Sequence, residues 1–157
     1  MTSPAVTFRD ARRADVPRIV GLLADDVLGA GREAGPGDGG ELADAYWDAF
    51  EQVEASSSNR IIVAEADGEV VGTLQLTLIP GLSRQGMTRA QIEAVRVAAS
   101  QRGQGLGAAM INWAIEEARG AGCGLVQLTS DRQRPAAIRF YESLGFTATH
   151  EGLKLPL

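Results

Sequence analysis

The sequence contains few of the residues that build cross-links and metal sites. There is one cysteine, Cys123, and one histidine, His150, in 157 residues. A single cysteine excludes an internal disulfide, and one cysteine with one histidine argues against a zinc site or another metal centre. The N-terminus has no hydrophobic stretch of the kind found in secretory signals. Together these absences lead us to expect a cytoplasmic protein.

Long apolar runs and an excess of positive charge are also absent. No apolar run is long enough to span a bilayer, so we expect no membrane partner. The formal net charge is -5, whereas nucleic-acid-binding domains usually carry a basic surface, so we expect no nucleic-acid partner. The length of 157 residues, 45% of them hydrophobic, fits a single domain spanning residues 1–157.

Apolar periodicity predicts a mixed order of strands and helices. Helices are predicted over residues 14–29, 41–55, 107–122 and 134–146. Strands are predicted over residues 5–12, 60–66, 69–80, 91–99 and 123–130, with one or two more in 146–157. The dipeptide Asp67-Gly68 predicts a tight hairpin turn, and the strand–helix–strand unit over residues 91–130 predicts a parallel pair with a right-handed crossover.

Three glycines are concentrated at the start of the third predicted helix, in the stretch QRGQGLGAAM at residues 101–110. A helix N-terminus presents unpaired N–H groups and the positive end of the helix dipole, and glycines let an anion approach them closely. Arg102 adds a positive charge beside the first glycine. The stretch therefore predicts a site for a pyrophosphate group.

Two kinds of ligand fit such a site. Gly103, Gly105 and Ala108 match the dinucleotide pattern G-x-G-x-x-A, and Asp131 ends the next predicted strand, where a ribose-binding acid could lie. This would indicate a redox enzyme of the Rossmann type. However, the unit follows an antiparallel meander, and no second mononucleotide-binding half comes after it. The other ligand is coenzyme A.

The motifs around the glycines resemble those of the GNAT superfamily of acyl-CoA N-acyltransferases. Residues 102–107, RGQGLG, match the R/Q-x-x-G-x-G/A motif, and VRV at residues 95–97 stands at the usual distance before it. AAIRFYESLGF at residues 136–146 matches the later helix with its tyrosine. The resemblance implies an α/β (α+β) fold. Its sheet would be mixed, mostly antiparallel and six- to seven-stranded, with helices on both faces and a central parallel pair of strands that splay apart.

The resemblance also implies acetyl-CoA as co-substrate. Strand backbone would pair with the pantetheine arm, amides at the helix start would hold the pyrophosphate, and the Val97 N–H would support the thioester carbonyl. Arg134 stands where the family often has asparagine; it could reach a phosphate, with Asp131 or Ser130 capping the helix instead. The positions expected to bind the cofactor are Val95, Arg96, Val97, Arg102, Gly103, Gln104, Gly105, Leu106, Gly107, Ala108 and Arg134.

The implied reaction is direct attack of a primary amine on the thioester. An unperturbed amine of this kind has a pKa of about 10.4, so a base must take its proton at neutral pH. Glu93 is the predicted base, because strand alternation places it on one face with Val95 and Val97. Tyr141 matches the family's usual general acid, and His150 is the alternative base.

The identity of the acceptor stays open between a small-molecule amine and a peptide amine. Asp25, Asp26 and Glu41 could attract a cationic amine. A homodimer formed through the last strands is an expectation of the resemblance alone. The alternative function is a regulatory module that binds CoA or a nucleotide without turnover, in which a base and an acid would be unnecessary.

Overall fold

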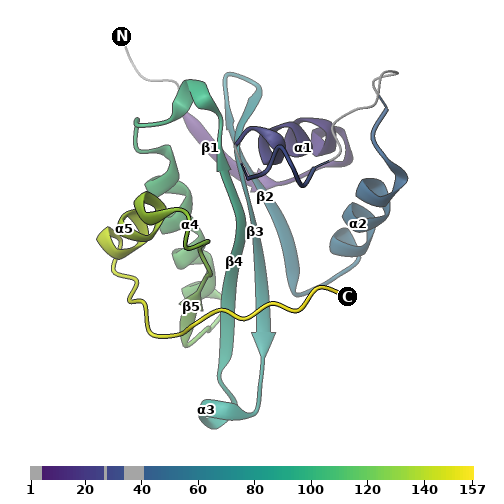
Figure 1. Ribbon diagram of the computed structural model, residues 1–157. Coiled ribbons are helices and arrows are strands. Elements are labelled where there is room, and N and C mark those ends of the chain that lie inside the picture. Colours follow the sequence, from purple (N-terminus) through teal and green to yellow (C-terminus); the bar gives the residue numbers. More distant parts are fainter. Residues whose placement is uncertain (1–4, 27, 34–40) are drawn as a thin grey trace. The chain divides into compact units, whose positions relative to one another are not determined.

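The computed structural model describes residues 5–26, 28–33 and 41–157 (Figure 1). The chain divides into two compact units, residues 1–127 and 128–157, and each is described by itself. No helix within the described part of the chain is long and apolar enough to cross a membrane.

One sheet forms the centre of the first unit. Its strands lie in the order β1-β2-β3-β4-β5, with the first three pairings antiparallel and β4–β5 parallel. The strands are β1 (Val6–Asp10), β2 (Asn59–Ala66), β3 (Glu69–Pro80), β4 (Thr88–Val97) and β5 (Leu125–Gln127). The mixed, mostly antiparallel sheet is as expected. The expected six to seven strands are wrong for the described residues, which form five, and the parallel pair lies at an edge of the sheet rather than at its centre.

The hairpin turn between β2 and β3 is confirmed. Asp67 has φ 50° and Gly68 has φ 81°, the two positive values that a tight two-residue turn requires. β3 and β4 form a second, longer hairpin that extends beyond the rest of the sheet and carries the single turn α3 (Ser83–Gly86) at its tip (Figure 1). Pro80 ends β3, as predicted.

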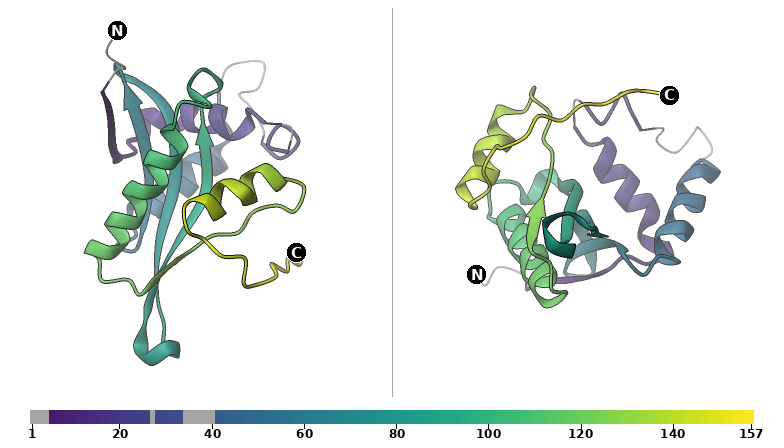
Figure 2. Two further views of the ribbon diagram at one scale, coloured as in Figure 1. Left: turned by 90° about the vertical axis from the view of Figure 1, so that its left-hand side faces the viewer. Right: turned by 90° about the horizontal axis from the view of Figure 1, so that it is seen from below.

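Helices cover both faces of this sheet. On one face, α1 (Val16–Ala24) and α2 (Asp44–Glu54) bury Phe50 and Val16 against Ile61 of β2. On the other face lies α4 (Leu106–Gly120), where Trp113 packs near Arg60 of β2. Arg60 and Ile61 are neighbours in one strand, so they point to opposite faces. Figure 2, right, shows the same arrangement along the strands.

Two short 3₁₀ turns lead into the longer helices. The turn η1 (Arg13–Asp15) precedes α1, and η2 (Ala99–Gln101) follows β4 and leads to the glycine stretch. Asp15 is the residue before α1, but its side chain does not cap that helix. Its carboxylate instead accepts hydrogen bonds from the backbone N–H of Arg12 and from the guanidinium of Arg9, both at 2.7 Å.

The second unit contains the helix α5 (Pro135–Ser143), which begins with a proline. After it, residues 146–157 form no strand, so the one or two final strands expected from the sequence are wrong. This difference accounts for the shortfall in strand number.

Candidate active site

The glycine stretch forms the turn that starts α4. Gly103 and Gly105 have φ 73° and 84°, in the left-handed region, and a side chain added at either would meet open space. Gly105 is the residue before the helix, and its carbonyl accepts the N–H of Ala109 at 3.0 Å. The N–H groups of Leu106, Gly107 and Ala108 precede that bond, so α4 offers them no acceptor. This geometry fits an anion held by main-chain amides.

The surroundings fix this turn in place without covering it. Leu106, the first residue of α4, is buried, whereas Gly103, Gln104 and Gly105 are exposed. The side chain of Gln104 donates to the carbonyl of Ser100 at 2.8 Å and so stays beside the turn. The amide-bearing surface is therefore open to a large, solvent-borne ligand.

The parallel pairing of β4 and β5 is short. Its register runs from Arg89 opposite Leu125 to Gln91 opposite Gln127, where β5 ends. β4 continues from Ile92 to Val97, and among the described residues of the first unit no strand lies beside this part on the β5 side. An extended chain could therefore pair with the free edge of β4, directly before the glycine turn.

A β-bulge interrupts β4 just where the site begins. Glu93 pairs with Gln75 of β3, and Arg96 pairs with Thr73, so two residues of β4, Ala94 and Val95, oppose one residue of β3. Ala94 has φ 53°, an unusual conformation for a residue other than glycine.

The bulge corrects one prediction about the site. Strict alternation would place Glu93, Val95 and Val97 on one face of the sheet. Val97 pairs with Gly72, whereas Glu93 pairs with Gln75, three residues further along β3. Glu93 therefore faces the side covered by α1 and α2, and Val97 faces the α4 side, because the extra residue reverses the alternation.

Two arginine–aspartate contacts connect the end of α1 to this part of β4. Arg102 donates to the Val97 carbonyl at 3.1 Å and pairs with Asp25 at 3.1 Å. Arg96 lies 2.9 Å from Asp26. The two carboxylates, expected to attract a cationic amine, instead face these two arginines.

Arg96 also donates to the Val95 carbonyl at 2.9 Å. The carbonyls of Val95 and Val97, at which the resemblance places the pantetheine arm, are thus each in contact with a guanidinium group. A carbonyl oxygen has two lone pairs, so these contacts leave room for a second donor.

Glu93 is exposed and is connected to β5 by a chain of side-chain amides. Its Oε1 accepts a hydrogen bond from Gln91 Nε2 at 2.8 Å. Gln91 Oε1 accepts from Gln127 Nε2 at 2.8 Å, and Arg89 donates to Gln127 Oε1 at 3.3 Å. These contacts orient one oxygen of the Glu93 carboxylate along the sheet.

Five of the residues singled out in the sequence lie in the second unit, namely Ser130, Asp131, Arg134, Tyr141 and His150. Tyr141 is half-buried in α5, with ring centroids of Phe140 and Phe146 at 5.1 and 5.9 Å. His150 is exposed, and its Nδ1 lies 2.7 Å from Thr149 Oγ1. The expected approach of Tyr141 to the β4 edge stays a prediction.

The predicted cap of α5 is wrong. The residue before the helix is Arg134, whose side chain makes no capping hydrogen bond. The Asp131 side chain accepts the N–H of Gln133 at 2.9 Å, and its carbonyl accepts the N–H of Arg134 at 2.9 Å. Asp131 therefore forms the turn before α5 rather than its cap.

Burial raises the pKa of the Cys123 thiol above its ordinary value. A thiol needs a lowered pKa to act as a nucleophile at neutral pH. Cys123 accordingly fits a structural role beside the start of β5.

Comparison with known protein families shows which family this chain belongs to. The model of the acetyltransferase (GNAT) family matches residues 30–146, which is most of the chain. The chain belongs to the acetyltransferase (GNAT) family. It is an N-acetyltransferase, as the sequence predicted, and the GNAT motif around the glycine turn coincides with the open amides at the start of α4.

Individual relatives of this GNAT protein support the same assignment. A glucosamine 6-phosphate N-acetyltransferase of Trypanosoma brucei brucei is 35% identical over 132 residues, which cover 84% of this chain and 86% of that protein. An aminoalkylphosphonate N-acetyltransferase of Salmonella typhimurium is 35% identical over 88 residues, 56% of each chain.

Among solved structures, a transcriptional regulator from Bacillus halodurans C-125 has a TM-score of 0.91 at 48% identity. The match covers 98% of this chain and 100% of that one.

The sequence did not predict the side-chain contacts that surround the glycine motif. The contacts of Asp26 with Arg96, and of Gln91 with Gln127, join positions far apart in the sequence. No local spacing signals either pair, because strand register and the bulge bring them together. The alternation of polar residues at positions 89, 91 and 93 was the one available signal for the amide chain.

Proposed function

We propose that this enzyme transfers the acetyl group of acetyl-CoA to a primary amine by direct attack on the thioester. The observation that carries the proposal is the open glycine turn, whose amides lie at the end of the unpaired edge of β4. The amides from Gly103 to Ala108 would hold the pyrophosphate, with Arg102 and Arg134 as its cationic partners. The backbone of Val95, Arg96 and Val97 would pair with the pantetheine arm.

In the proposed reaction, Glu93 takes a proton from the amine, directly or through a water molecule. The amine nitrogen then forms a bond to the acetyl carbon while the bond from that carbon to sulfur breaks. Tyr141 donates its proton to the departing thiolate, whose conjugate thiol has an unperturbed pKa of about 8.5. The Val97 N–H supports the thioester oxygen as negative charge develops on it.

We place both compact units in one acetyltransferase domain, because the family match at residues 30–146 runs through both. The acceptor is proposed to be a small-molecule amine, since the relatives are named for glucosamine 6-phosphate and aminoalkylphosphonate. A homodimer remains part of the proposal and is testable by sedimentation.

The test is an assay of thiol release from acetyl-CoA with a panel of primary amines. Glu93→Gln should lower kcat by about 10²-fold or more at neutral pH, because it removes the base. Tyr141→Phe should lower kcat by a similar factor while leaving the Kd for acetyl-CoA unchanged. Full activity of Tyr141→Phe with every accepted amine would reject the assignment of the acid, and no acetyl-CoA binding by folded protein would reject the proposal.

One observation favours a second candidate, a regulator that binds CoA without turnover. The solved structure at 48% identity is named as a transcriptional regulator. The same assay separates the two functions: a regulator would bind acetyl-CoA and release no thiol with any amine. Glu93, exposed on the sheet face and oriented by Gln91, favours the enzyme.

A further inference from the structure

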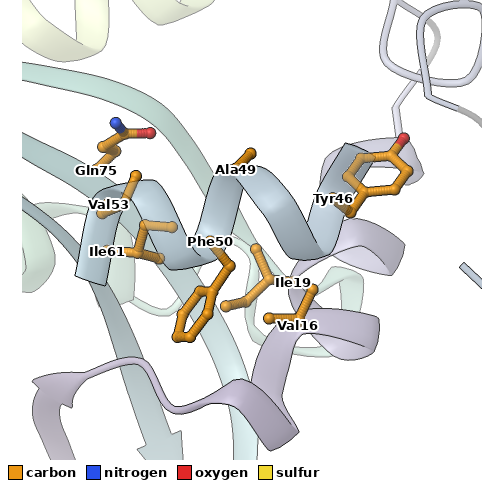
Figure 3. A pocket seen from close by; sticks show the side chains of 8 residues that line it. All are labelled: Val16, Ile19, Tyr46, Ala49, Phe50, Val53, Ile61 and Gln75. Carbon is orange, nitrogen blue, oxygen red and sulfur yellow. The ribbon is translucent and has the colours of Figure 1, made fainter. Parts of the chain in front are cut away.

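A small cavity lies between α1, α2 and the sheet in the first unit (Figure 3). Its volume is about 110 Å³. The side chains around it come from both helices and from β2 and β3: Val16, Ile19, Phe50, Val53, Ile61 and Gln75. The described lining residues include no Asp, Glu, Lys, Arg or His. The cavity therefore suits an uncharged, apolar group.

The two ends of the cavity differ. Tyr46 lies at the N-terminal end of α2, and its hydroxyl donates to Glu33 at 2.8 Å, which fixes the ring against the loop after α1. Gln75 lies at the other end, near Val53 (Figure 3). The Gln75 amide is therefore the polar group at the end of the cavity nearer the C-terminus of α2.

Strand register connects this polar end to the proposed base. Gln75 is the partner of Ile61 on β2 and of Glu93 on β4, so all three side chains are on one face of the sheet. Cβ atoms of directly opposed residues in such pairs are about 4.5–5.5 Å apart. An amine at Glu93 would thus have its substituent next to Gln75, at the end of the cavity that Gln75 lines.

The bulge in β4 is the reason for this proximity. With regular alternation from Val97 back to Glu93, the carboxylate would face α4, on the side away from the cavity. The extra residue at Ala94–Val95 returns Glu93 to the face that α1 and α2 cover. One distortion of the strand therefore brings a carboxylate and an apolar cavity to the same face.

We propose that this cavity is the acceptor subsite for the apolar part of the amine. The inference rests on the proposed function and adds the substrate class: an unbranched or compact aliphatic primary amine whose alkyl group enters between α1 and α2. An apolar cavity of about 150 Å³ holds a benzene ring, so this one holds about four or five carbon atoms.

Straight-chain primary amines from methylamine to octylamine are the probes. KM should fall by about fourfold per added methylene, the factor that corresponds to ~0.8 kcal/mol, and should level off after four or five carbons. Amines of equal length that carry hydroxyl groups should have higher KM values, because the cavity offers their hydroxyls few partners. Titration of the amines into the protein without acetyl-CoA should give the same ranking of Kd.

Ala49→Phe tests the site by filling it, since Ala49 lines the cavity from α2. The variant should lose the dependence of KM on chain length. Ala45→Phe is the matched control: Ala45 is exposed on the same helix, one turn earlier, and does not line the cavity. It should keep the wild-type profile.

Val53→Ala tests the site in the opposite direction, because it enlarges the cavity. It keeps the test valid if Ala49→Phe fails to fold. In Val53→Ala, the chain length at which KM levels off should move to longer amines. Active enzyme whose chain-length profile is unchanged in both cavity variants would overturn this inference and leave the proposed function standing. Wild-type protein that acetylates no amine would overturn both.

Discussion

At the scale of single residues, Asp26 joins the end of α1 to the strand that carries the site. One carboxylate oxygen accepts the N–H groups of Leu28 and Gly29 at 2.9 and 2.6 Å. The other lies 2.9 Å from Arg96 Nε, and both side chains are 19% exposed. An asparagine could still accept the two backbone bonds but would leave the cation of Arg96 without its counter-charge.

We therefore expect Asp26→Asn to lower the free energy of unfolding by about 1–3 kcal/mol. For a chain of this size that corresponds to a fall in Tm of about 2–4 °C per kcal/mol, measurable by calorimetry. The control is Asp25→Asn, because the Asp25–Arg102 pair is half exposed and should contribute about 0–1 kcal/mol. Equal losses in the two variants would contradict this ranking.

Asp15 should make the free energy of unfolding depend on pH in the acidic range. The hydrogen bond from Arg9 is the main cause that holds the pKa of Asp15 below its ordinary value, against the opposing effect of burial. A lowered pKa in the folded state contributes stability that is complete above the unfolded pKa, about 3.9, and is lost as pH falls through the folded value.

Asp15→Asn should accordingly be less stable than wild type at pH 7, by about 1–2 kcal/mol. The difference should shrink below about pH 4, where Asp15 takes up a proton in the unfolded chain but still resists protonation in the folded protein. Urea unfolding at pH 7 and at pH 3 measures both values. A deficit that stays constant over this range would show that the charge of Asp15 is not what stabilises the fold.

At the scale of elements, the bulge of β4 is the feature with the largest consequence for the site. Ala94 adopts φ 53°, which costs an L-residue about 1–2 kcal/mol relative to glycine. Ala94→Gly should therefore stabilise the protein by up to about 1 kcal/mol, after the greater backbone entropy of glycine in the unfolded chain is subtracted.

Ala94→Val should destabilise the protein, because a β-branched residue fits this conformation worst. Chemical denaturation measures both changes. Ala90→Gly in the same strand is the control: Ala90 is buried and has no positive φ, so glycine should lower stability there. Lower stability of Ala94→Gly than of wild type would argue against a left-handed residue at this bulge.

Some secondary-structure elements could be predicted from the sequence alone, and others could not. Asp67-Gly68 predicted its turn because both positions need a positive φ, and the apolar spacing predicted where the helices lie. The bulge has no such signal, since alanine at residue 94 gives no hint of a left-handed conformation. The alternation in residues 146–157 suggested strands, but a strand also needs a partner, which a local pattern cannot supply.

The same limit applies to the candidate site. The glycine motif predicted the turn before α4 because the conformation is encoded within seven consecutive residues, 102–108. The face of Glu93 was predicted wrongly, because it depends on how β4 registers against β3. Side-chain contacts such as Gln91 with Gln127 depend on a parallel pairing between strands separated by a whole helix.

At the scale of the whole molecule, the proposed acetyl-CoA site draws on segments that must be folded together. The glycine turn, the edge of β4 and the aspartates after α1 come from distant parts of the chain, and an unfolded chain would not assemble them. A ligand that binds only the folded state raises stability by RT ln(1 + [L]/Kd). Acetyl-CoA at 100 times its Kd should thus add about 2.7 kcal/mol, a rise in Tm of roughly 5–11 °C.

The same thermal experiment distinguishes coenzyme A from a dinucleotide as the ligand of the glycine turn. NAD should leave Tm unchanged, because the turn follows antiparallel strands rather than beginning a dinucleotide-binding unit. Gly105→Val should reduce the rise with acetyl-CoA, since a β-branched side chain at φ 84° would displace the amides at the start of α4. Gly120→Val, at the far end of that helix, is the control and should retain the rise. An equal rise in Tm with NAD and with acetyl-CoA would instead favour a dinucleotide as the ligand of the glycine turn.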